Sequence, residues 1–174
     1  MKDIIKPIAV LAAICLVITA LLAYVNSVTS PIIKAAEEEN AAKARAEVLS
    51  EADGFEQIET NLPEGVTEAY RATNGAGYVF MLTTKGYGGN INLICGIKSD
   101  GTIESTQTLT HSETSGIGSR VVDNASPYRQ QYEGKSENEL DSVDAVTGAT
   151  ISSKAYKKAI TAAFEAYDTV KEAE

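Results

Sequence analysis

The sequence predicts an α+β protein: an N-terminal transmembrane helix and stalk, then an antiparallel sheet flanked by helices. Three observations predict this architecture. An uncharged apolar run opens the chain, strand-like alternation begins after Ala76, and apolar residues return to helical spacing after Ser152. Strands joined by short turns, with helices before and after them, are typical of the α+β class. The 174 residues are enough for one domain with an appendage.

The first element is the apolar run Pro7–Tyr24, "PIAVLAAICLVITALLAY", which contains no charged residue. As a helix it would be about 27 Å long, close to the hydrocarbon thickness of a bilayer. Lys2 and Lys6 precede it, which predicts a cytoplasmic N-terminus and a main domain on the extracytoplasmic side of the inner or plasma membrane. A cleaved signal peptide is the alternative, but the run is longer than is usual for one. We therefore expect residues 1–28 to be a single-pass anchor in membrane lipid, with a short cytoplasmic N-terminus.

The second element is a helix rich in Ala, Glu and Lys, expected within residues 29–54. Pro31 suits a first helical turn, and Asp53-Gly54 suits an end. Its apolar stripe is thin and consists of Ile32, Ala36, Ala44, Val48 and Leu49. This pattern predicts a stalk that continues from the membrane helix, and a domain helix packed on the sheet is the alternative. Residues 55–174 would then form the extracytoplasmic domain.

Three strands are predicted next, and short turns connect them. The strands are "YVFMLTT" (78–84), "INLICGI" (91–97) and "TIESTQTLT" (102–110). The glycines of "KGYGGN" and the Asp100-Gly101 pair supply the turns. Short turns between consecutive strands predict an antiparallel meander.

Two helices are expected after the sheet. A short one follows Ser126 as N-cap with Pro127 in its first turn. A longer one begins near Ser152 or Ser153, either of which could cap it. Its apolar stripe consists of Tyr156, Ile160, Ala163, Tyr167 and Val170. This stripe should pack on the sheet.

Charge and cysteine usage exclude several classes of function. The chain carries 24 acidic and 15 basic residues, a net charge of −9, so nucleic acid is not expected as a partner. Cys15 lies in the apolar run and Cys95 in a predicted strand, so they are poor disulfide partners. With His111 as the single histidine and no Cys-rich motif, we expect no protein-ligated metal.

The stretch "DAVTGATISS", Asp144 to Ser153, combines small residues and hydroxyls just before the last helix. Gly148 permits a tight turn, and the N-terminus of the following helix would attract an anion such as phosphate. Helix capping alone is the simpler alternative. No P-loop lysine follows the glycine, so a nucleotide triphosphatase is not expected. Hydrolysis by a serine or threonine nucleophile would need His111 as the base, oriented by Asp144 or Glu113. The chain has no GxSxG elbow, so this reaction is not favoured either.

"DAVTGAT", Asp144 to Thr150, resembles the D-x-x-(S/T)-G-A-T flavinylation motif of the FMN-binding domain family. This family occurs in the G subunits of Rnf complexes and in the C subunits of Na⁺-translocating NADH:quinone reductases. The resemblance implies that a flavin transferase attaches FMN covalently to Thr150 by a phosphoester and recognises Asp144. It also implies that Thr147, Gly148 and Ala149 take part in the cofactor site.

Two more segments resemble the same family. "GYGGNINLICGIKSDGTI" (86–103) is similar to its Gly-Tyr-Gly-Gly strand and hairpin, and "HSETSGIGSR" (111–120) to its H-x-E-T-P-G-L-G loop. Ser115 departs from the family's Pro, and Ile117 replaces Leu but stays apolar. The flavin contacts that this resemblance implies are Glu113, Thr114, Gly116, Ile117 and Gly118.

The resemblance implies an electron-transfer subunit of an Rnf complex, which passes electrons between reduced ferredoxin and NAD⁺ while moving Na⁺ or H⁺. Its partners would be the other Rnf subunits and, during maturation, the flavin transferase. Three alternatives stay open: a component of the quinone reductase, a stand-alone extracytoplasmic flavoprotein, and a non-redox binding domain. Tyr70, Tyr78 and Tyr87 could line an electron path, although packing on the sheet is the favoured role.

Overall fold

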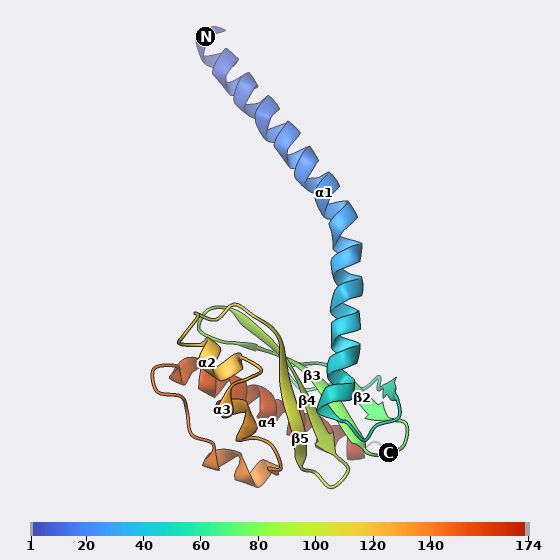
Figure 1. Cartoon of the computed structure of the whole chain (residues 1–174). Helices are drawn as coiled ribbons and strands as arrows, with labels where there is room; N and C mark the ends of the chain where they lie inside the picture. The colour runs from blue at the N-terminus through green and yellow to red at the C-terminus, as the bar shows by residue number, and fades with distance from the viewer. Residues whose placement is uncertain (1, 173–174) are drawn as a thin grey trace. The chain divides into compact units, whose positions relative to one another are not determined.

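The structure, a computed structural model, describes residues 2–172 and divides into two compact units (Figure 1). One unit extends to Asn40 and the other begins at Ala41. Helix α1 (Lys2–Val48) opens the chain, and about its last two turns belong to the second unit.

Within the first unit, α1 is long and apolar enough to cross a membrane. An 18-residue window of this helix has a mean hydropathy of 2.8, and none of that window is buried. The helix continues through Pro7 and Pro31, so Pro31 does not begin a separate stalk helix. The helix also ends at Val48, earlier than the expected end at Asp53-Gly54.

The second unit is built on a five-stranded antiparallel sheet whose order follows the chain, β1-β2-β3-β4-β5. The strands are β1 (Phe55–Gln57), β2 (Val66–Ala72), β3 (Gly77–Lys85), β4 (Asn90–Lys98) and β5 (Ile103–His111). The predicted meander of the last three strands is confirmed. β1 and β2 were not predicted, because β1 is three residues long and β2 does not alternate strictly between buried and exposed positions.

Both faces of the sheet are covered, as the alternating residues of β4 show. Leu93 and Cys95 belong to the core cluster on the α4 face, whereas Ile94 belongs to the cluster that contains Val48 at the end of α1. Gly96 permits this second contact, since a Cβ there would lie 2.1 Å from the carbonyl oxygen of Val48. The end of α1 is therefore a domain helix, and the compact unit begins at Ala41 rather than at the expected residue 55.

Helix α4 (Thr150–Glu172) covers the other face of the sheet. Its predicted apolar stripe is confirmed, because Tyr156, Ile160, Ala163, Tyr167 and Val170 are all buried. The predicted start is wrong, however. The helix begins at Thr150, which places Ser152 and Ser153 inside its first turn rather than at the N-cap.

The segment between the sheet and α4 contains three short elements: α2 (Ser119–Val122), α3 (Pro127–Gln130) and the 3₁₀ helix η1 (Glu137–Ser142). The predicted cap of α3 is confirmed, since the Ser126 hydroxyl accepts a hydrogen bond from the Tyr128 N–H at 3.2 Å.

Candidate functional site

A hollow of about 460 Å³ lies at the N-terminal end of α4. Three segments that are far apart in the sequence form it: the β3–β4 turn, the loop after β5, and the turn that leads into α4. Its lining residues are Tyr87, Glu113, Thr114, Ile117, Gly118, Gly148, Ala149, Thr150, Ile151 and Ser152. The three segments with family motifs therefore meet at one place in the fold.

Most of the predicted site residues line this hollow, and three do not. Gly116 has a φ of +78° in an exposed turn, where its N–H donates to the Ser119 hydroxyl at 2.9 Å. Thr147 is exposed and does not line the hollow. Asp144 is exposed on a separate shallow surface that also includes Gln131.

The "TGAT" segment is a tight turn followed directly by the helix. The Ala149 N–H donates to the Val146 carbonyl at 2.9 Å, and Gly148 has the positive φ (+83°) that the third position of a type II turn requires. The Ser153 hydroxyl accepts from the Val146 N–H and donates to the Ala149 carbonyl, both at 3.0 Å. Ser153 thus ties the turn to the helix and leaves Thr150 exposed at the first helical position.

The beginning of α4 is suited to an anion. The first N–H groups of a helix have no carbonyl partner within it, and the helix dipole places positive potential there. The first turn of α4 contains no acidic residue that would compete for these groups. A phosphate ester on the exposed Thr150 hydroxyl would therefore lie in a favourable field.

Glu113 joins the three segments of the hollow. Its side chain is buried, with one carboxylate oxygen accepting from the Gly88 N–H at 3.2 Å and the other from the Ser152 hydroxyl at 2.9 Å. Backbone packs against the same carboxylate on two sides: a Cβ at Gly86 would lie 2.0 Å from Oε1, and one at Gly118 would lie 2.1 Å from Oε2. Gly86 and Gly118 thus leave no room for a Cβ beside the Glu113 carboxylate.

His111 supports this loop from outside the hollow. Its Nδ1 accepts from the Glu113 N–H at 3.2 Å, and its Nε2 lies 3.5 Å from Oδ1 of Asp123. In neutral imidazole this arrangement places the proton on Nε2, because Nδ1 is the acceptor. His111 therefore orients the loop that carries Glu113, which is a different role from that of a base for a hydroxyl nucleophile.

The lining of the hollow fits FMN. Among the described residues from Ala41 onward, the exposed large apolar side chains are Tyr87, Ile117 and Ile151, and all three line this hollow. Their surfaces suit a planar, largely apolar ring, while the Thr150 hydroxyl and the start of α4 suit a phosphate. The volume lies within the range of sites for small molecules and cofactors.

Three lining residues were not predicted as cofactor contacts. Tyr87 was favoured as a packing residue, but it is 72% exposed, whereas Tyr70 and Tyr78 are buried. Its place inside the "GYGG" motif was the available signal. Ser152 was expected to cap the helix or to offer a hydroxyl to an anion, and Ile151 directly follows Thr150.

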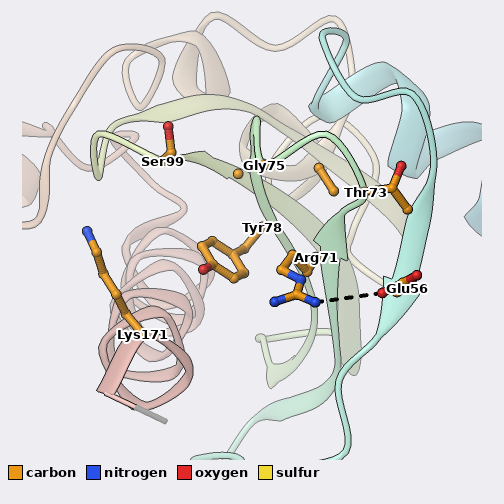
Figure 2. Close-up of a pocket in the computed structure, with 9 residues that line it drawn as sticks. Glu56, Arg71, Thr73, Gly75, Tyr78, Ser99 and Lys171 are labelled. Carbon is orange, nitrogen blue, oxygen red and sulfur yellow. Dashed lines mark ion pairs between the residues drawn. The ribbon is translucent and has the colours of Figure 1, made fainter. Parts of the chain in front are cut away.

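A second hollow, of about 470 Å³, lies at the opposite end of α4 (Figure 2). Figure 2 shows Arg71 and Glu56 facing each other across part of it, with 3.7 Å between the guanidinium and the carboxylate. Lys171, from the last turn of α4, donates to the Tyr167 hydroxyl at 2.9 Å, a bond that raises the pKa of Lys171. None of the predicted site residues lines this second hollow.

Comparison with known proteins agrees with the motifs. The FMN-binding domain family matches residues 86–165, and the RnfG N-terminal region matches residues 1–48. The G subunit of the ion-translocating oxidoreductase complex of Methanosarcina acetivorans is 31% identical, over 94% of each chain. The G subunit of the proton-translocating ferredoxin:NAD⁺ oxidoreductase complex of Clostridium ljungdahlii is 28% identical, over 89% of this chain and 86% of the relative. The Na⁺-translocating counterpart from Acetobacterium woodii is also 28% identical, over 97% and 94%. These matches confirm the resemblance found in the motifs, and the chain belongs to the family of G subunits of ion-translocating oxidoreductase complexes.

Proposed function

We propose that this chain is an electron-transfer subunit of a membrane-bound, ion-translocating ferredoxin:NAD⁺ oxidoreductase and carries FMN on Thr150 through a phosphoester. One observation carries this proposal: the three motif segments converge on a hollow into which α4 presents its N-terminus and the exposed Thr150 hydroxyl. The similarity to the G subunits of such complexes over almost the whole chain supports the assignment.

Different residues of the hollow would hold different parts of the cofactor. The Thr150 hydroxyl is the attachment point, and the free N–H groups at the start of α4 stabilise the phosphate. Tyr87, Ile117 and Ile151 offer apolar surface to the ring, while Glu113 holds the three segments together. When bound, FMN supplies one- and two-electron redox chemistry, and the protein supplies orientation and electrostatics.

The proposed location follows from α1. Residues 1–28 would anchor the chain in lipid with the N-terminus in the cytoplasm, because Lys2 and Lys6 precede the apolar run. Residues 29–40 would connect the membrane to the folded domain, which begins at Ala41 and would lie on the extracytoplasmic side. A diffusible flavin would be lost from that side, so a covalent bond would keep the site occupied.

Maturation would depend on a flavin transferase that recognises Asp144. The Asp144 side chain is exposed, and its backbone N–H is the group bonded to Gln131, at 3.3 Å. A recognition residue has to be accessible to the modifying enzyme, and Asp144 meets that requirement. The other subunits of the complex would be the chain's lasting partners.

The proposal is tested by the intact mass of the full chain, purified from cells that contain the flavin transferase. We expect wild type to carry one FMN and to remain fluorescent after denaturation. Thr150→Ala should lose both signals, Thr150→Ser should keep part of them, and Thr147→Ala, in the neighbouring exposed position, should keep most of them. An unmodified mass for wild type would refute covalent attachment.

A further inference from the structure

Glu113 is a buried carboxylate without a counter-charge. It is 8% exposed, and the described part of the chain provides no cation for it: the ion pairs found there involve other residues. It is also the one charged residue among those that line the hollow. We propose that the Glu113 carboxylate, through its negative charge, lowers the reduction potential of the flavin, an inference that depends on the proposed function.

The contacts of Glu113 are with neutral hydrogen-bond donors. Its two carboxylate oxygens accept from the Gly88 N–H and the Ser152 hydroxyl. Ser152 belongs to the first turn of α4, so the positive end of the helix dipole is close to the carboxylate. These groups carry no net positive charge, so they can bond to the carboxylate and leave its negative charge uncompensated.

The packing around Glu113 keeps water away from the charge. Gly86 and Gly118 approach the two oxygens so closely that a Cβ at either position would overlap with them. In such a site the effective dielectric constant is far below that of water, and a charge acts more strongly on its neighbours. A cofactor in the hollow would experience this field because the carboxylate is part of the lining.

The effect on the potential has a definite sign. Uptake of two electrons and one proton by a flavin adds one negative charge to its ring system. A fixed carboxylate beside the ring opposes that added charge, so it disfavours reduction. Glu113 therefore acts as a tuning residue, and the electrons and protons are exchanged by the flavin and its redox partners.

The test is the reduction potential of the flavin-loaded full chain, measured by spectroelectrochemical titration. Glu113→Gln keeps the side-chain shape, and the Ser152 hydroxyl can turn to accept from the amide. We expect this variant to favour reduced flavin about tenfold more than wild type, a rise of about 30 mV for a two-electron couple. Glu133→Gln, which removes an exposed carboxylate, is the control and should leave the potential unchanged. Equal potentials for wild type and Glu113→Gln would overturn the proposal.

A second pair of variants separates charge from geometry if Glu113→Gln fails to fold or to take up flavin. Glu113→Asp and Glu113→Ala both lose the bridge between Gly88 and Ser152, but only the alanine variant loses the charge. The alanine variant should therefore have the higher potential, and equal values for the two would contradict the proposal. If wild type carries no FMN, the proposed function fails; if all chains carry FMN with one common potential, only the role of Glu113 fails.

Discussion

The two ends of α4 each border a hollow, and the two hollows differ in chemistry rather than in size. Their volumes are about 460 and 470 Å³, and Ile151 and Lys171 mark them about 30 Å apart along the helix. The N-terminal hollow is lined by hydroxyls, small residues and exposed apolar side chains, with Glu113 as its charged group. The C-terminal hollow is lined by the charged residues Glu56, Arg71 and Lys171.

This difference shows why volume alone does not identify a site. At the C-terminal end, the charged groups are used within the protein: Arg71 pairs with Glu56, and Lys171 donates to Tyr167. A lysine in the last turn also offsets the negative end of the helix dipole. At the N-terminal end, backbone donors and the Thr150 hydroxyl remain available to an anion. The two hollows therefore differ because one lies at the positive end of the α4 dipole, with free N–H groups, and the other at its negative end.

Asp144→Ala, just before the turn into α4, should give the largest difference in flavin loading from a matched change near the C-terminal end of the helix. We expect flavin attachment to be abolished while the unfolding midpoint stays unchanged, because the Asp144 side chain is exposed and alanine keeps the backbone N–H bonded to Gln131. Asp168→Ala, which removes an exposed carboxylate near the other end of α4, is the control and should load fully. Intact mass and thermal denaturation measure the two properties. Full loading of Asp144→Ala would remove its assigned role.

A matched pair of glycines gives an intermediate effect. Gly148 and Gly75 line the two hollows, have φ values of +83° and +74°, and leave space for a Cβ. Alanine at either position should cost about 1–2 kcal/mol of unfolding free energy through the left-handed backbone. Only Gly148→Ala should also lower the flavin-loaded fraction, because it disturbs the turn that precedes Thr150. Urea unfolding and intact mass test this, and equal loading of the two variants would contradict a special role for the N-terminal hollow.

Glu56→Gln in the C-terminal hollow should have only a slight effect. Its ion pair with Arg71 spans 3.7 Å between largely exposed side chains, and such pairs contribute about 0–1 kcal/mol. The unfolding free energy measured in urea should therefore change by a few tenths of a kcal/mol, and flavin loading should remain at the wild-type level. A clear loss of loading would show that the C-terminal hollow takes part in the cofactor site.

Local patterns predicted most of the architecture. Alternation identified the cores of β3, β4 and β5, and apolar residues at helical spacing identified the buried face of α4. These signals are strong because each follows from burial on one face of a regular element. β1 and β2 escaped prediction because they are defined by pairing: β2 combines buried and exposed positions irregularly and is placed by its register with β3.

Short motifs predicted three segments that the folded chain brings together at one hollow. The glycine turn, the hydroxyl of Thr150 and the anion-attracting start of a helix are local properties that a few consecutive residues can encode. The folded chain was needed to show that Ser152 serves Glu113 rather than a helix cap, and that Tyr87 and Ile151 complete the hollow. The physical reason is distance along the chain: the bond between Ser152 and Glu113 joins residues 39 positions apart, and the contact exists only after the sheet has brought the loop and α4 together.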